Sequence, residues 1–279
     1  MKLSIITINR NNRDGLLSTI DSVLLQTARI QFEYIVIDGA SIDGSIDLIR
    51  SRSGEIDYWI SEKDGGIYNA MNKGVAQAQG EYCLFLNSGD TLNDSDVVRD
   101  VLPHLDDLHD FVIGSIFEGK NRTTVPDPIT FLWMYKASIP HSGAFIRRSL
   151  LLKYPYDETL KIVSDWKFFL KALIIDNASY KLIERPIACF DKTGTSCTQP
   201  LKVEEERRKV LDELIPPRIT LDYLQFTQGN GYQNTDYDRF YIKMRKYRYG
   251  KVFYKLNVLT MQFIACFRKG ARFAREYKW

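Results

Sequence analysis

Residues 33–44 read Glu-Tyr-Ile-Val-Ile-Asp-Gly-Ala-Ser-Ile-Asp-Gly, an apolar β-branched run that ends in a polar turn. The run at 33–37 predicts a buried strand that stops at Asp38. Ser45 to Arg52 then has the spacing of a helix, with Asp43 as a candidate cap. A buried strand followed directly by a helix is typical of an α/β protein.

The same alternation continues on both sides of this segment. The predicted strands are 3–8, 33–37, 58–61 and 81–86, and the predicted helices are 14–26, 45–52 and 67–78. Farther along, we expect a strand over 111–117 and a helix over 165–175. Alternating strands and helices imply a mostly parallel sheet of right-handed βαβ units. The sequence therefore predicts an α/β, Rossmann-like, doubly wound architecture that binds nucleotides at the C-terminal ends of its strands.

The composition is that of a globular protein. The chain has 279 residues, of which 44% are hydrophobic and 26% are charged, so disordered, collagen-like and disulfide-scaffold classes are excluded. Its four cysteines lie far apart, without Cys-x-x-Cys spacing, which favours reduced thiols in a cytoplasmic protein. The N-terminal apolar run is interrupted from Asn9 to Asn12, unlike a signal peptide, and no run reaches the roughly 20 apolar residues of a membrane span.

Polar residues stand where each of the four predicted strands stops. They are Thr7 to Asn9, Asp38, Asp64 and Asp90. Each alone is explained by turn chemistry, but together along one sheet edge they indicate a ligand site. No Gly-x-Gly-x-x-Gly follows the first strand, which disfavours a dinucleotide site, and no Gly-Lys-Ser/Thr is present, which argues against a P-loop.

Four segments carry a resemblance to a known family: Ser4-Ile5-Ile6-Thr7, residues 35–44, residues 65–74 (Gly-Gly-Ile-Tyr-Asn-Ala-Met-Asn-Lys-Gly) and residues 80–90 (Gly-Glu-Tyr-Cys-Leu-Phe-Leu-Asn-Ser-Gly-Asp). Together they resemble the family 2 glycosyltransferases, most closely the bacterial enzymes of polysaccharide, O-antigen and colanic-acid-type assembly. The resemblance covers about residues 3–200. It implies the GT-A nucleotide-diphospho-sugar transferase fold and inversion at the anomeric carbon.

Carried over by position, the resemblance also implies the donor site. Thr7 and Asn9 would line the nucleotide pocket. Asp38 would accept a hydrogen bond from the base or ribose, as a carboxylate can. Asp64 would lie near the nucleoside.

The family's metal motif, Asp-x-Asp, falls on Asn87-Ser88-Gly89-Asp90, which leaves Asp90 as the only carboxylate and puts Asn87 in the donor site. One or two carboxylates with phosphate oxygens suffice for Mg²⁺, and Mn²⁺ also takes oxygen ligands. The resemblance therefore implies a divalent cofactor, Mn²⁺ or Mg²⁺, held by Asp90. As a Lewis acid it would stabilise the departing nucleoside diphosphate.

An inverting transfer also needs a base for the acceptor hydroxyl. Ser164-Asp165-Trp166 resembles the segment in which the family places that carboxylate, so Asp165 is the candidate base; a helix N-cap is the alternative. His141, in Ile139-Pro140-His141, matches a position where the family often has histidine and would orient acceptor or diphosphate. Structural packing is the alternative for a lone histidine.

The C-terminal tail is strongly basic. Residues 239–279 hold twelve Lys and Arg against Glu276 alone, a net charge of +11, which leaves −8 on the rest of a chain of net charge +3. Apolar residues at 252, 256, 259, 263 and 267 form a helical stripe between basic flanks. Such a helix fits an anionic inner-membrane surface. Packing on the catalytic domain or on a second subunit of a homodimer is the alternative, and nucleic acid is not expected.

The sequence thus predicts a GT-A catalytic domain over 1–200 and a helical extension over 201–279. The expected activity is metal-assisted, inverting transfer of a hexosyl or N-acetylhexosaminyl group from a nucleotide-diphospho-sugar to a hydroxyl of a glycan, lipid-linked at the cytoplasmic face of the membrane. Two alternatives stay open. A nucleotidyltransferase is disfavoured because residues 7–12 lack glycine. A non-catalytic nucleotide-sugar-binding subunit is favoured by Asn87 and Gly89, but disfavoured by Asp90 and Asp165.

Overall fold

The structure is a computed structural model that describes residues 1–106, 108–191 and 198–227. Two compact units divide the chain, Met1–Leu214 and Ile215–Trp279. The expectations for the basic tail at 239–279 lie outside the described residues. In the part of the chain that is described, no helix combines the length and the apolar character needed to cross a membrane.

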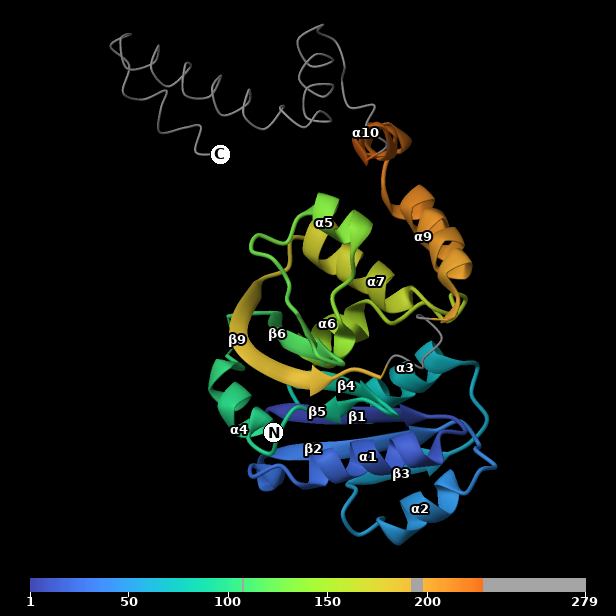
Figure 1. Cartoon of the computed structure of the whole chain (residues 1–279), viewed down its shortest axis with the longest axis vertical. Coiled ribbons are helices and arrows are strands. Elements are labelled where there is room, and N and C mark those ends of the chain that lie inside the picture. The colour runs from blue at the N-terminus through green and yellow to red at the C-terminus, as the bar shows by residue number, and fades with distance from the viewer. Residues whose placement is uncertain (107, 192–197, 228–279) are drawn as a thin grey trace, which may run out of the picture. The chain divides into compact units, whose positions relative to one another are not determined.

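The first unit contains the sheet and most of the helices (Figure 1). Its strands are β1 (Leu3–Asn9), β2 (Phe32–Asp38), β3 (Tyr58–Ser61), β4 (Tyr82–Asn87), β5 (Thr91–Leu92), β6 (Phe111–Glu118), β7 (Asn121–Thr123), β8 (Ala144–Arg147) and β9 (Tyr180–Cys189). Its helices are α1 (Arg13–Leu24), α2 (Ser45–Ser51), α3 (Ile67–Gln77), α4 (Val97–Val101), α5 (Phe131–Lys136), α6 (Arg148–Lys153), α7 (Ser164–Phe169) and α9 (Pro200–Leu214). Single 3₁₀ turns lie at Arg29–Gln31, Leu102–His104 and His141–Gly143. The second unit contributes α10 (Pro217–Thr227).

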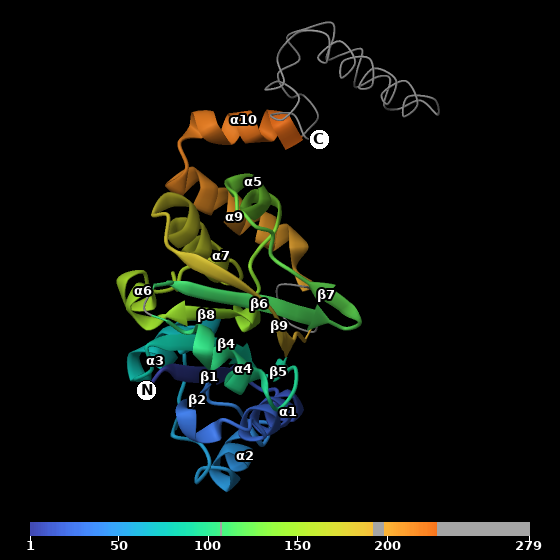
Figure 2. The ribbon, with the colours of Figure 1, turned by 90° about the vertical axis from the view of Figure 1, so that its left-hand side faces the viewer.

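The described strands form one mixed sheet in the order β3-β2-β1-β4-β8-β6-β9-β5, and β7 pairs with β6. Strands β3, β2, β1 and β4 are parallel, which confirms the predicted βαβ arrangement. Beyond them, β8 runs antiparallel to β4 and to β6, and β6 is again parallel to β9. Figure 1 shows β3, β2, β1 and β4 below the green β6, and Figure 2 shows β8 between β4 and β6 and β7 beside β6.

The secondary structure over residues 1–90 agrees with the pattern of the sequence. Each predicted strand and helix there is present, with ends within two residues of those expected. The predicted strand at 111–117 is β6. The predicted helix at 165–175 is α7 followed by one π-helical stretch, Leu170–Ile175.

Helices fix the parallel strands from both faces. Both β1 and β2 are buried along their whole length, as expected for parallel strands covered on two sides. Leu16 of α1, Ile49 of α2 and Val97 of α4 join one apolar cluster on the sheet. On the other side α3 approaches so closely that a Cβ added to Gly74 would lie 2.4 Å from Ile6 Cγ2. The loops that follow β1 and β4 therefore start from a rigid base.

Candidate active site

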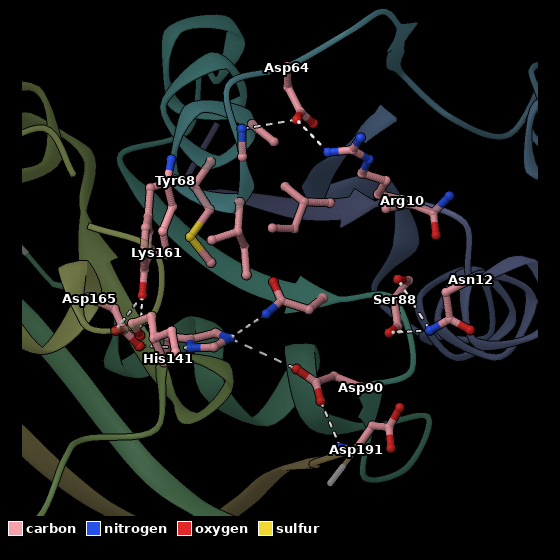
Figure 3. Close-up of a pocket in the computed structure, with 18 of the residues that line it drawn as sticks. Arg10, Asn12, Asp64, Tyr68, Ser88, Asp90, His141, Lys161, Asp165 and Asp191 are labelled. Carbon is pink, nitrogen blue, oxygen red and sulfur yellow. Dashed lines mark hydrogen bonds and ion pairs between the residues drawn. The ribbon is translucent and has the colours of Figure 1, made fainter. Parts of the chain in front are cut away.

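A cavity of about 530 Å³ lies at the C-terminal ends of β1 and β4. Segments far apart in sequence meet there: the loop after β3, the turn before β8, the start of α7 and the end of β9 (Figure 3). Six of the predicted site residues line it: Asn9, Asp64, Asn87, Asp90, His141 and Asp165. The structure thus brings most of the predicted site into one space.

His141 stands at the centre of the polar groups in this cavity. Its Nδ1 lies 3.3 Å from Oδ2 of Asp165. Its Nε2 lies 3.1 Å from Nδ2 of Asn87 and 3.9 Å from Oδ2 of Asp90. Figure 3 shows the imidazole between the two carboxylates. His141 therefore links the predicted base to the predicted metal ligand, instead of packing in an apolar core.

The two carboxylates and burial act in opposite directions on this histidine. Burial lowers the pKa of His141, but the hydrogen bond and charge of Asp165 and the charge of Asp90 outweigh burial, so the pKa is raised. Burial raises the pKa of Asp90 to about 6, although the charge of His141 and hydrogen bonds from backbone N–H groups oppose that shift. The two carboxylates thus both favour the protonated form of His141.

Asp165 lies in the first turn of α7, and the N-cap residue of that helix is Val163. The N-cap alternative for Asp165 is therefore wrong. Its Oδ1 accepts a hydrogen bond from Trp166 N at 2.9 Å and lies 3.0 Å from the Tyr68 hydroxyl. The carboxylate is part of the cavity wall, with 18% of the side chain exposed. An acceptor hydroxyl in the cavity could reach it.

The loop after β4 has oxygen atoms that suit a hard cation. Asp90 Oδ2 and Asn87 Oδ1 are buried and have no hydrogen-bond partner among the described residues. Asp90 Oδ1 accepts from the backbone N–H of Asp191. No cluster of three or more His, Cys, Asp or Glu side chains suited to a metal occurs in the described ranges. Carboxylate and amide oxygens are nevertheless ligands that suit a hard divalent cation, whose remaining ligands would come from diphosphate and water.

The other end of the cavity is lined by the end of β1 and by the loop after β3. Asp64 accepts a hydrogen bond from Gly66 N at 3.0 Å, and Arg10 Nη1 lies 3.9 Å from its Oδ1. Asn9 donates to Asp38 Oδ1 at 2.8 Å, and its own Oδ1 is buried with no hydrogen-bond partner in the part of the chain that is described. Asn9 can thus offer a free acceptor atom at this end.

Thr7 and Asp38 lie beneath the cavity and do not line it. Both are fully buried. The Thr7 hydroxyl accepts from Tyr34, and the Asp38 carboxylate accepts four hydrogen bonds, from Asn9, from Ser41 N and Oγ, and from Ser61. In this conformation Asp38 holds Asn9 and the loop after β2 in place.

Several residues of the site were not anticipated from the sequence: Arg10, Tyr68, Lys161 and Asp191. Asp191 follows the end of β9 just as the predicted aspartates follow their strands, and that signal could have identified it. Tyr68 and Lys161 gave no such signal, because a tyrosine on an amphipathic helix and a lysine in a loop are both ordinary.

Comparison with known proteins gives matches over most of the chain. The model of glycosyl transferase family 2 matches residues 4–166. A protein described as an uncharacterised glycosyltransferase of Mycobacterium tuberculosis is 32% identical over 260 residues, 88% of this chain and 98% of that protein. A PGL/p-HBAD biosynthesis glycosyltransferase of Mycobacterium bovis is 30% identical over 206 residues, 68% of this chain and 77% of that protein.

Solved structures share the fold. TarS 1–349 of Staphylococcus aureus, in complex with UDP-GlcNAc, has a TM-score of 0.63 at 19% identity over 87% of this chain and 76% of that chain. The mannosyltransferase PcManGT of Pyrobaculum calidifontis, in complex with GDP-Man and Mn²⁺, has a TM-score of 0.58 at 17% identity over 77% and 66% of the two chains. This chain spans 60% of the TarS fragment in its UDP complex. The mixed α/β sheet with its flanking helices is thus a GT-A fold, and the chain is a glycosyltransferase that belongs to glycosyl transferase family 2.

Proposed function

We propose that this protein transfers a sugar from a nucleoside-diphospho-sugar to a hydroxyl of a polysaccharide or glycolipid acceptor, with inversion at the anomeric carbon. The observation that carries the proposal is the convergence of Asp165, His141 and Asp90 in one cavity. It supplies a base at one end of the imidazole and oxygen ligands for the leaving group at the other.

Asp165 is the proposed base. An inverting displacement is a single step in which the acceptor oxygen bonds to the anomeric carbon as the bond to the diphosphate oxygen breaks. The proton of the acceptor hydroxyl passes to a carboxylate oxygen of Asp165. His141, hydrogen-bonded to Asp165 through Nδ1, orients this carboxylate. Its position between the two aspartates also suits it to contact the acceptor or the diphosphate.

Asp90 and Asn87 are the residues that would hold a divalent cation, Mn²⁺ or Mg²⁺, through their unpartnered oxygens. When bound, such a cation acts as a Lewis acid that stabilises the negative charge on the nucleoside diphosphate. The presence of Mn²⁺ in the PcManGT complex supports this proposal.

The nucleoside is proposed to bind at the end formed by Asn9 and Asp64, with Asp38 and Thr7 supporting it from beneath. The UDP, UDP-GlcNAc and GDP-Man in the neighbouring structures support a nucleotide-sugar donor of the hexosyl or N-acetylhexosaminyl type. Arg10, which lines the same end of the cavity and lies 3.9 Å from Asp64, is proposed to contribute a positive charge beside the bound nucleotide.

The acceptor is proposed to be lipid-linked. A relative named for PGL/p-HBAD biosynthesis and one named poly(ribitol-phosphate) beta-N-acetylglucosaminyltransferase support a glycolipid or polysaccharide acceptor. The net charge of +11 at 239–279 supports a peripheral position on an anionic inner membrane for that segment. In this proposal the residues that contact donor and acceptor lie within 1–200, and the extension over 201–279 begins with α9, which belongs to the first unit.

The test combines binding and turnover. Melting temperatures are measured with UDP, GDP, UDP-GlcNAc and GDP-Man, each with Mn²⁺, Mg²⁺ or EDTA, and nucleoside diphosphate release is followed for the donor that binds. We expect metal-dependent stabilisation by one nucleoside. We also expect Asp165→Asn to lower turnover by about 10²–10⁴-fold, the usual share of a general base, without loss of donor binding. Unchanged turnover in Asp165→Asn would contradict the assigned base.

A further inference from the structure

Helix α9 holds the backbone just before the proposed base. The carboxylate of Glu206, which is only 6% exposed, accepts hydrogen bonds from three consecutive backbone N–H groups. These are Lys161 N at 2.9 Å, Ile162 N at 2.9 Å and Val163 N at 3.2 Å. A buried carboxylate with three donors is firmly fixed, and its charge lies at the N-terminus of α7, where it is favourable.

The same helix also contacts the residues just after the base. The guanidinium of Arg207 lies 4.8 Å from the ring centroid of Trp166. The ammonium of Lys167 lies 2.7 Å from Glu213 near the end of α9. Contacts from α9 therefore bracket Asp165 on both sides in sequence, at 161–163 and at 166–167.

Helix α3 holds this segment from another direction. The Tyr68 hydroxyl donates to the carbonyl oxygen of Ile162 at 2.5 Å and lies 3.0 Å from Asp165 Oδ1. The Lys161 ammonium donates to the carbonyl oxygen of Gly65 at 3.4 Å. The backbone of 161–163 is thus held through its N–H groups by α9 and through a carbonyl by α3.

None of the described residues of α9 lines the cavity. Glu206 therefore acts on the site only through the backbone of 161–163. A base works only within hydrogen-bond reach of the proton that it takes, and a displacement of about 1 Å can cost on the order of 10²-fold in rate. Loosening 161–163 would let the Asp165 carboxylate move by such an amount.

We infer that Glu206 is a positioning residue for Asp165, and that α9 is part of the catalytic architecture although it lies beyond the segment 4–166 that defines the family match. This inference rests on the proposed role of Asp165 as base. Through the backbone of 161–163, Glu206 sets the position of the Asp165 carboxylate. Tyr68 of α3 supports the same backbone from another side.

The experiment compares Glu206→Gln with Glu205→Gln in the full chain. Glu205 is the matched control, because it is the adjacent residue on the same helix and its side chain is 65% exposed and paired with Lys209. Both variants lose one negative charge. For each variant, kcat and KM are measured with the donor that the melting-temperature test identifies, beginning with UDP-GlcNAc. Hydrogen–deuterium exchange is followed for the peptide that covers 159–168.

In Glu206→Gln we expect faster exchange at 161–163 and a kcat lowered by about 10–100-fold. The KM for donor should stay within about twofold of the wild-type value, because the proposed donor contacts, Asn9, Asp64, Asn87 and Asp90, lie in other segments. Glu205→Gln should have the exchange rate, kcat and KM of the wild type. Glu213→Gln is a second, milder variant: Lys167 keeps Asp157 as a partner, so the protein should fold normally and lose kcat by a few fold.

Two patterns would overturn the inference. One is unchanged exchange at 161–163 in Glu206→Gln. The other is full turnover in Glu206→Gln while Asp165→Asn is impaired. In that case Asp165 would remain the proposed base, but Glu206 would not be needed to position it. Full turnover in Asp165→Asn as well would instead overturn the proposed function, and the inference with it.

Discussion

Nδ1 of His141 lies 3.3 Å from Oδ2 of Asp165. The two residues come from the turn before β8 and from the first turn of α7. Nε2 of the same ring lies near Asn87 at the end of β4 and near Asp90 in the loop that follows. In the proposed reaction the imidazole therefore connects the base to the residues at the leaving group.

His141 and Asp165 are expected to be energetically coupled. Replacing either alone, His141→Gln or Asp165→Asn, should lower turnover, but the double variant should fall well short of the product of the two effects because groups that act as a unit are non-additive. A double-mutant cycle on kcat measures this. Fully multiplicative effects would mean that the 3.3 Å contact plays no part in turnover.

Asp90 is expected to be required for metal-dependent binding of nucleotide. In Asp90→Asn the stabilisation by nucleoside diphosphate with Mn²⁺ should fall to the level seen with EDTA, because the charged oxygen is lost. Asp47→Asn, an exposed residue paired with Arg50, serves as the control. Since burial disfavours the charged form of Asp90, the ligand-free melting temperature should not fall. An undiminished Mn²⁺-dependent shift in Asp90→Asn would exclude this residue as a ligand.

Gly80 is expected to tolerate no side chain. A Cβ there would lie 2.5 Å from Ser4 Oγ and 2.6 Å from backbone atoms of Leu3 and Ser4. Because strand backbone cannot easily shift, Gly80→Ala should cost about 1–3 kcal/mol of unfolding free energy. At Gly54, where a Cβ meets nothing within 4 Å, the substitution to alanine should change the free energy of unfolding by less than about 0.5 kcal/mol. Urea denaturation of both variants measures these changes. Equal free energies of unfolding for the two variants would show that the backbone of β1 shifts to accommodate the added Cβ.

The ion pair between Asp94 and Arg185 should make stability depend on acid pH. Two hydrogen bonds from the Arg185 guanidinium, at 2.9 and 2.5 Å, hold the pKa of Asp94 well below its usual range. An acid whose pKa is lowered on folding stabilises the protein above its unfolded pKa of about 3.9 and loses that contribution as the pH falls toward the folded pKa.

Asp94→Asn should therefore be less stable than the wild type at pH 7, and the difference should shrink below about pH 4. With 43% of the Asp94 side chain exposed, the difference should stay under about 1 kcal/mol. Urea midpoints at pH 7 and pH 3 measure it. If the stability difference between wild type and Asp94→Asn grew as the pH was lowered, it would contradict the prediction.

Patterns of residues next to one another in sequence were sufficient for the first half of the fold. The β-branched runs at 3–8 and 33–37 and the helical spacing at 67–78 depend on local periodicity, and all three elements are present. Strand β8 is different: it pairs antiparallel with both β4 and β6. Its four residues, Ala144–Arg147, are too few to show a period, so only pairing partners distant in sequence define it.

The site divides in the same way. Asn9, Asp64 and Asp90 were predictable because each follows a parallel strand, and the ends of parallel strands meet at one edge. Glu206 was not predictable: its three hydrogen bonds bridge more than forty residues of chain, and in sequence it is one acid among several on a charged helix.

Local patterns in the sequence were sufficient to predict parallel strands at 3–8, 33–37, 58–61 and 81–86 and the polar residues at their ends, because strand periodicity and turn chemistry are local properties. Three relationships required the folded chain: Asp38 lies beneath the cavity, His141 lies between Asp165 and Asp90, and α9 holds the backbone before Asp165. These relationships depend on burial and on distances between segments that only the folded chain brings together.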